Sequence, residues 1–246
     1  MLISFFEEFP TPANIKKLKL LNFKTKLYIA AKNLNDFNKI QSTMKSKNVG
    51  EIIYWPILEG KEGYWISPFA KRSALKRIFN ELKGTRTAVM LDLELTRNPN
   101  LYVTQFFNFL RNKSLIKSFI KTHGGKVYLA EYYPEGKRKE RILAFLGLHY
   151  KTNAVHIIKM VYHSMHNFDK KFITNELQAG KKEFGNKYLV AYGTIAKGID
   201  GWEPILPTLQ LDKDLEIAKQ TGIPEVVIFR LGGLNRKYLK VIKKFV

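Results

Sequence analysis

The sequence predicts an α/β protein made of a single (β/α)8 TIM barrel that spans residues 1–246. The chain length of 246 residues is close to the roughly 250 that is typical of such barrels. Eight short apolar runs, rich in β-branched and aromatic residues, recur along the chain, and each is followed by a segment of helical period. The runs are continuous rather than alternating, as parallel strands covered on both faces require. No change in composition separates two halves, so we expect one domain.

The predicted strands, in chain order, are residues 2–9, 26–31, 51–58, 87–95, 126–133, 155–163, 188–196 and 225–233. The predicted helices are residues 13–22, 33–46, 71–84, 101–125, 137–150, 172–185, 211–222 and 235–245. Asn33 is a good N-terminal cap for the second helix, and Gly84 and Gly124 are typical helix ends. Short connections and regular alternation favour a closed barrel over an open doubly wound sheet.

The composition is that of a folded protein with a strong positive charge. Lys and Arg number 42 against 21 Asp and Glu, which gives a net charge of +21, and Cys is absent. The basic residues are spread over nearly every predicted helix, which indicates a lysine-coated surface with non-specific, salt-sensitive binding to polyanions. The absence of Cys excludes disulfides, zinc–thiolate sites and cysteine nucleophiles.

No stretch approaches the 18 apolar residues of a transmembrane helix, and none is predicted. The N-terminus, MLISFFEEFP, lacks the basic region and the cleavage site of a signal peptide and is typical of a strand. The default expectation is a cytoplasmic protein. The compartment and the oligomeric state stay open.

Acidic and aromatic residues concentrate where the predicted strands end, although the chain as a whole is short of acids. In a (β/α)8 barrel, these carboxyl ends and the following loops form the active site. Aromatic rings stack on sugar faces while carboxylates bind hydroxyl groups, so the pattern predicts a carbohydrate substrate. The candidate substrate-binding residues are Glu8, beside Glu7, with Tyr54, Trp55, Glu131, Tyr132 and Trp202.

Asp92 and Glu94 form the most specific local pattern, at the end of the fourth predicted strand. Strand periodicity places both side chains on one face, with Cβ atoms about 6–7 Å apart. Such a pair suits acid–base chemistry, because one ionised carboxylate keeps its neighbour protonated as a general acid. The alternative reading is a structural ion pair with the abundant Lys.

Together with Met160-Val161-Tyr162 on the sixth strand, this D-x-E pattern resembles the chitinase-like barrel of glycoside hydrolase family 18. The resemblance implies that Glu94 is the general acid and that Asp92 orients the substrate's N-acetyl group. That group itself attacks the anomeric carbon in the family. Tyr162 would help to hold it. The implied activity is hydrolysis of a polysaccharide or an N-acetylated glycan.

The sequence departs from the family at several positions. Ala88 and Met90 stand where the fourth strand of the family carries earlier Asp residues, and His163 stands where its sixth strand has Asp. The eighth strand ends in Arg230-Leu231-Gly232-Gly233 instead of the usual Trp, and the chain has no room for the family's common inserted domain.

Three other functions stay open. A catalytically inactive barrel could bind sugar without cleaving it. Gly193, Gly198, Gly232 and Gly233 are placed to bind a phosphate through their amides. A divalent-metal enzyme would use Glu94, Glu131, His163 and His166, but an i,i+3 pair of His at a strand end has poor ligand geometry. We predict no metal and no cofactor.

Overall fold

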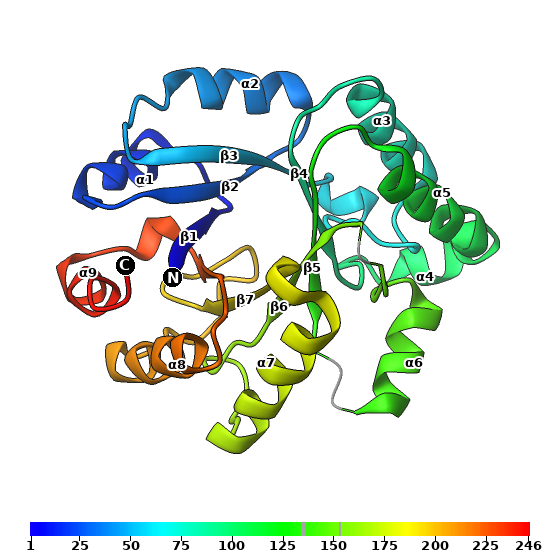
Figure 1. Cartoon of the computed structure of the whole chain (residues 1–246). Coiled ribbons are helices and arrows are strands. Elements are labelled where there is room, and N and C mark those ends of the chain that lie inside the picture. The colour runs from blue at the N-terminus through cyan, green and yellow to red at the C-terminus, as the bar shows by residue number, and fades with distance from the viewer. Residues whose placement is uncertain (134–135, 153) are drawn as a thin grey trace. The chain divides into compact units, whose positions relative to one another are not determined.

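The computed structural model of the protein is a closed barrel of eight parallel strands that follow one another in chain order. It describes residues 1–133, 136–152 and 154–246. The alternation of strands and helices can be followed in Figure 1 from the blue β1 to the red α9. The predicted α/β class and the single (β/α)8 barrel are confirmed.

The strands are β1 (Leu2–Glu7), β2 (Thr25–Ala31), β3 (Val49–Pro56), β4 (Val89–Leu93), β5 (Val127–Tyr132), β6 (His156–Met160), β7 (Tyr188–Gly193) and β8 (Glu225–Phe229). The helices are α1 (Pro12–Ile15), α2 (Leu34–Thr43), α3 (Arg72–Leu82), α4 (Asn100–Thr104), α5 (Phe109–Thr122), α6 (Lys137–Leu146), α7 (Lys170–Phe184), α8 (Thr208–Gln220) and α9 (Arg236–Ile242). Short 3-10 turns are η1 (Lys16–Leu20), η2 (Gly60–Glu62), η3 (Phe106–Asn108), η4 (Gly185–Lys187) and η5 (Leu231–Gly233).

The structure differs from the prediction most clearly at residues 101–125. The single long helix expected there is divided into α4, η3 and α5, with the break at Gln105, whose φ of −102° and ψ of 6° leave the helical region. Aromatic residues and Asn around the break have low helix propensity, so this segment does not hold a continuous helix. The prediction of one helix was wrong. The first predicted helix is likewise divided, into α1 and η1.

The chain divides into two compact units. One comprises Met1–Ala30, Ile40–Ile53 and Ile157–Val246, and the other comprises Ala31–Lys39 and Tyr54–His156. The prediction of a single domain over residues 1–246 stays a prediction. No helix within the described ranges is both long enough and apolar enough to cross a membrane.

In the first unit, β1 lies between β2 and β8, with Phe5 in register with Leu27 on one side and Ile228 on the other. A buried polar network crosses these strands at their amino ends. Glu225 accepts hydrogen bonds from Ser4 Oγ at 2.7 Å, Tyr28 Oη at 2.9 Å and Lys26 Nζ at 2.7 Å. Because its donors satisfy it, this buried carboxylate is compatible with a packed interior.

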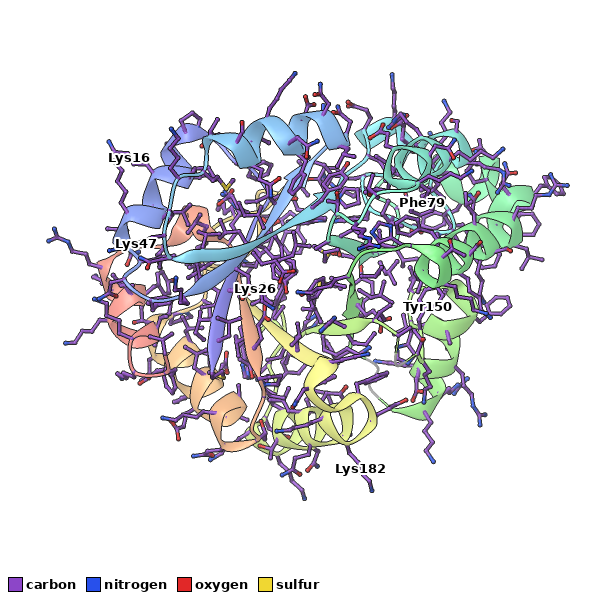
Figure 2. All side chains as sticks on the ribbon, turned by 45° about the horizontal axis from the view of Figure 1, so that its top comes forward. Lys16, Lys26, Lys47, Phe79, Tyr150 and Lys182 are labelled. Atoms are coloured by element: carbon purple, nitrogen blue, oxygen red, sulfur yellow. The ribbon has the colours of Figure 1, made fainter. Side chains whose placement is uncertain are left out.

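Lysine side chains also cover the surface. Figure 2 shows Lys16, Lys47 and Lys182 extending outward from the ribbon, and all three are exposed. The second unit contains a buried aromatic contact between two helices: Phe79 of α3 stacks on Phe119 of α5 with ring centroids 4.4 Å apart. This contact packs the two helices against each other.

Candidate active site

Glu7, the last residue of β1, and Glu8, which follows it, have different surroundings. The Glu7 side chain is fully buried and accepts hydrogen bonds from the amides of Phe9 and Gly232, at 2.8 and 2.6 Å, and from Arg230 Nη1 at 3.0 Å. Burial raises the pKa of the Glu7 carboxyl, and the charge of Arg230 and the two amides work against that rise. Glu7 therefore ties the start of the chain to the loop after β8.

Glu8 is also buried, but its carboxylate meets a second one. A Cβ built on Gly198 would lie 2.8 Å from Glu203 Oε1 and 3.0 Å from Glu8 Oε2, so both carboxylates converge on Gly198. The ring of Phe229 is at 2.9 Å from the same point. The structure therefore joins the predicted Glu8 to Glu203, a residue of the loop after β7.

Asp92 and Glu94 both lie in the second unit. Asp92 is buried on β4, in register with Ala130 of β5, whereas Glu94 is half-buried and follows the strand. Tyr132 at the end of β5 donates a hydrogen bond from its hydroxyl to Glu94 Oε2 at 2.7 Å. Burial, followed by the Glu94 charge, raises the pKa of Tyr132, so the hydroxyl stays a neutral donor at physiological pH.

Glu131 is not brought together with these residues. It is in register with Leu93, so strand alternation directs it to the opposite face of the β4–β5 pair from Asp92. There the fully buried carboxylate contacts His149 Nδ1 at 2.8 Å and accepts a hydrogen bond from the Tyr150 amide at 2.9 Å. We therefore leave Glu131 out of the proposed site.

Tyr54 and Trp55 point to opposite faces of β3 by the same alternation. Tyr54 is fully buried and its ring lies 5.0 Å from that of Phe37 on α2, so it packs between the strand and the covering helix. We leave Tyr54 out of the site as well. Trp55 is buried on the other face.

Tyr162 and Trp202 lie in loops of the first unit. Tyr162 follows β6, is half-buried, and its ring is 6.1 Å from that of Phe229. Trp202 lies in the loop after β7 and is 64% exposed, so its ring is accessible to a ligand. Both residues stay candidates on these placements.

His163 contacts a residue that the sequence analysis missed. Its Nδ1 lies 2.7 Å from Oδ1 of the fully buried Asp214 on α8, and its Nε2 lies 3.0 Å from the carbonyl oxygen of Phe168. Gln210, one turn before Asp214, donates to the same carboxylate oxygen at 2.9 Å. The i,i+4 spacing of Gln210 and Asp214 was visible in the sequence, but nothing there indicated a partner in the loop after β6.

The stability of the first unit should fall as the pH rises because of this pair. Burial lowers the pKa of His163, but Asp214 and the Phe168 carbonyl raise it by more, so the net shift is upward. The stabilisation is fully present below the unfolded-state pKa of about 6.5 and is lost as the pH rises through the higher folded value. We expect the urea-derived free energy of unfolding to decrease between pH 6 and pH 9, and His163→Gln to remove part of that dependence. An NMR titration that places the His163 pKa below that of a free histidine would contradict this.

Two of the four glycines that suggested a phosphate site lie against carboxylates. The Gly232 amide already donates to Glu7 Oε2, and Gly198 lies against Glu8 and Glu203. A phosphate there would meet like charge and would find the Gly232 donor occupied. These contacts disfavour the phosphate-binding reading. Among residues 1–133, 136–152 and 154–246, no group of three or more His, Asp or Glu side chains could hold a metal ion.

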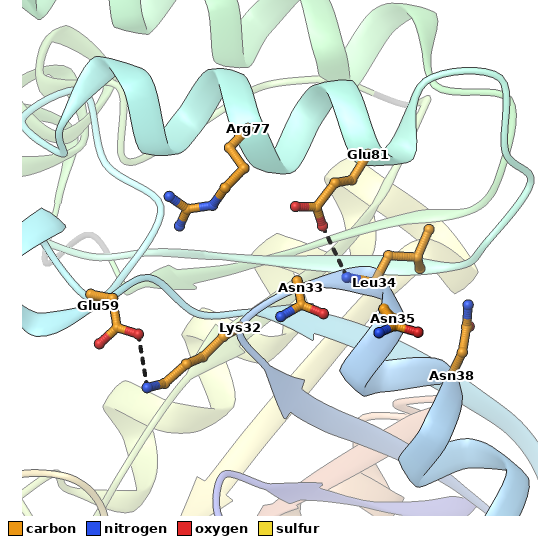
Figure 3. Close-up of a pocket in the computed structure, with 8 residues that line it drawn as sticks. All are labelled: Lys32, Asn33, Leu34, Asn35, Asn38, Glu59, Arg77 and Glu81. Atoms are coloured by element: carbon orange, nitrogen blue, oxygen red, sulfur yellow. Dashed lines mark hydrogen bonds and ion pairs between the residues drawn. The ribbon is translucent and has the colours of Figure 1, made fainter.

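A pocket of about 780 Å³ lies beside the start of α2 in the second unit (Figure 3). Its charged lining is internally paired: Lys32 binds Glu59 at 2.8 Å, and Glu81 accepts a hydrogen bond from the Leu34 amide at 2.9 Å. Arg77 is held by Glu62 through two hydrogen bonds, of 2.9 and 2.8 Å. The charged side chains that line the pocket therefore already bind other groups of the protein, and we propose no catalytic role for this pocket.

Neither a protein-family model nor a curated protein sequence matches the chain. Solved structures do. The chitinase of Chromobacterium violaceum ATCC 12472 has a TM-score of 0.58 at 11% identity, covering 99% of this chain and 98% of that chain. The PgaB (BpsB) glycoside hydrolase domain from Bordetella bronchiseptica has a TM-score of 0.53 at 10% identity, covering 93% of each chain. A D-tagatose 3-epimerase-like protein has a TM-score of 0.52 at 14% identity, covering 99% and 95%.

At these identities the likeness shows the fold alone. The chain is a (β/α)8 barrel similar to the barrels of chitinases and other glycoside hydrolases, which confirms the predicted resemblance at the level of the fold. The likeness to an epimerase-like barrel shows that the same fold also supports other sugar chemistry, so the reaction has to be argued from the site.

Proposed function

We propose that the protein is a glycoside hydrolase that acts on a polysaccharide or an N-acetylated glycan. The observation that carries this proposal is the carboxyl group of Glu94, held at 2.7 Å by the Tyr132 hydroxyl just beyond β4. Asp92 precedes it by two residues and lies on β4. A carboxyl group in a fixed orientation, next to a second carboxylate, is what general acid catalysis at a glycosidic bond requires.

Glu94 is the general acid in this proposal, and Tyr132 is a positioning residue. The Tyr132 hydroxyl engages Oε2 and so fixes the rotation of the carboxyl group, which then presents its proton in a defined direction. Asp92 orients the reacting N-acetyl group of the substrate. The buried position of Asp92 on β4 supports this role, because burial keeps bulk water away from a carboxylate that must hold a neutral amide.

The other proposed contacts with substrate are based on the family resemblance and on the kinds of side chain that bind sugars. Tyr162 as the partner of the N-acetyl group stays a prediction, as do Trp55, Trp202 and Glu8 as substrate-binding residues. Trp202 is supported by its exposed ring, and Glu8 by its buried position beside Gly198, which the Glu203 carboxylate also approaches.

The wild-type protein should release the aryl group from aryl N-acetylglucosaminides and shorten N-acetylglucosamine oligomers, as measured by absorbance and by chromatography of the products. Turnover that co-purifies with the protein and disappears with Glu94→Gln supports the proposal. Absence of turnover on any glycoside would overturn it.

Tyr132→Phe should lower kcat more than it changes KM. A hydrogen bond to a charged group contributes about 1.5–3 kcal/mol, so the loss should be roughly 10- to 100-fold. Tyr150→Phe is the matched control, because it also removes a largely buried hydroxyl but belongs to the Glu131 side of β5, where the Tyr150 amide binds that carboxylate. Equal losses in the two variants would argue against a role for Tyr132 in positioning Glu94.

A sugar-binding barrel without hydrolytic activity is the second candidate. It is favoured by Met90, which is fully buried on β4 where the resembled family has an acidic residue. Binding of N-acetylglucosamine oligomers by calorimetry, without any product, would select this candidate.

A further inference from the structure

An unusually exposed apolar surface lies on the second unit, on residues that the proposed function does not use. We call it the α4–α6 surface, and its members are Val103, Phe106, Phe107, Leu110, Ile142 and Phe145. Each of these large apolar side chains is at least half exposed, and Phe107 reaches 89%. Contiguous exposed apolar area of this kind marks an interaction site, whereas isolated exposed apolar residues need no explanation.

Printed contacts link some of the elements that carry the α4–α6 surface. Phe106 and Phe107 of η3 have ring centroids 5.6 Å apart. Phe109 at the start of α5 is 5.9 Å from Phe145 of α6. Lys113 of α5 closes the junction by donating to the carbonyl oxygens of Ala144 and Phe145, at 2.9 and 2.7 Å. These contacts hold α6 against α5.

The surroundings of this surface are basic. No Asp or Glu occurs between Glu94 and Glu131, a stretch that contributes Arg97, Arg111 and several Lys. On α6, Arg138 and Arg141 are exposed and stand four residues before Ile142 and Phe145, respectively, so each arginine shares a helix face with one apolar member.

We propose that the α4–α6 surface binds the protein to an anionic lipid bilayer. Exposed Phe, Leu, Ile and Val side chains insert at the boundary of headgroups and acyl chains, while neighbouring Arg and Lys contact anionic headgroups. A second copy of the chain fits less well, because each copy carries +21 and would bring its own basic rim against the other. A glycan surface fits less well because Val103, Leu110 and Ile142 offer neither a flat ring nor a hydrogen-bonding group.

Co-sedimentation with large unilamellar vesicles tests the proposal. The protein of residues 1–246 should bind vesicles that contain about one third phosphatidylglycerol, and pure phosphatidylcholine vesicles should retain far less of it. Vesicle binding should weaken as the salt concentration rises. It should weaken less than the binding of a protein that is held by charge alone, because insertion of apolar side chains supplies part of the binding free energy.

Two pairs of variants test whether binding depends on the α4–α6 surface itself. In each pair, the control makes the same kind of change elsewhere on the protein, so that an effect of net charge or of overall hydrophobicity would appear in both variants. Phe107→Ser/Leu110→Ser should weaken vesicle binding on the order of tenfold or more, since it removes two inserting side chains. Its control is Leu209→Ser/Val246→Ser, which removes two exposed apolar side chains of the first unit. Arg138→Glu/Arg141→Glu should also lose binding, whereas Lys16→Glu/Lys182→Glu, with the same change in net charge on exposed residues, should keep most of it.

Circular dichroism and hydrolysis of a soluble glycoside should be unchanged in all four variants, so failure of this inference is distinguishable from failure of the proposed function. Equal losses in the test and control variants, or no binding to anionic vesicles, would overturn it. Concentration-dependent dimerisation of the wild type that Phe107→Ser/Leu110→Ser abolishes would also overturn it, in favour of a second copy as the occupant.

Discussion

Glu94→Gln should lower kcat on aryl N-acetylglucosaminides and on N-acetylglucosamine oligomers by a factor on the order of 10²–10⁴, which is typical of a lost general acid. The amide keeps the shape of the side chain and can still accept the hydrogen bond from Tyr132, but it has no proton to deliver to the glycosidic oxygen. KM should change little. The comparison is by steady-state kinetics on both substrates.

Comparing two substrates distinguishes a role of Glu94 in proton transfer from a role in binding. An aryl leaving group of low pKa departs with little protonation, so the loss in Glu94→Gln should be smaller on the activated aryl glycoside than on the oligomer. Glu183→Gln, an exposed substitution on α7, should retain full activity. An equal loss on both substrates would indicate that Glu94 acts through binding, and full activity of Glu94→Gln would exclude it as the acid.

Glu7→Ala should destabilise the protein by about 3–5 kcal/mol, because breaking a buried charge pair leaves the partner charge uncompensated. Three kinds of donor lose their acceptor at once: the amides of Phe9 and Gly232, the side chain of Asn14 and the guanidinium of Arg230. For a chain of this size, each kcal/mol corresponds to roughly 2–4 °C in Tm. Thermal and urea denaturation measure the effect.

Glu216→Ala on α8 is the matched control for that loss. Glu216 is exposed, and its carboxylate accepts a hydrogen bond from Gln220 at 2.9 Å. Its removal should change the free energy of unfolding by no more than about 0.5 kcal/mol. A Glu7→Ala variant as stable as this control would show that Arg230 and the loop after β8 are held by other contacts.

The order of strands and helices was predictable because it depends on local patterns. Continuous apolar runs such as that around Val89 and capping signals such as Asn33 are visible within a few residues, and the barrel follows from their alternation. Strand periodicity also predicts that Asp92 and Glu94 share one face; in the structure Glu94 follows β4, and Tyr132 donates a hydrogen bond to it. The break at Gln105 was missed, since a helical pattern there continues through a point where propensity is low.

Other features depended on contacts between distant parts of the chain. Glu7 and Glu8 are adjacent and chemically identical, yet Arg230, 223 residues away, fixes Glu7 in a structural role, whereas Glu8 meets Glu203 beside Gly198. His163 acquires its partner Asp214 only when the loop after β6 lies against α8.

The sequence by itself therefore determined the class of fold, the order of its elements and the residues that share a strand face, because each of these follows from backbone geometry over a few residues. Only the tertiary structure decided which carboxylates are already engaged: Glu131 by His149 and Tyr150, and Glu7 by Arg230 and Gly232. The physical reason is that a buried carboxylate must be satisfied by donors, and those donors arrive from segments whose proximity no local pattern encodes.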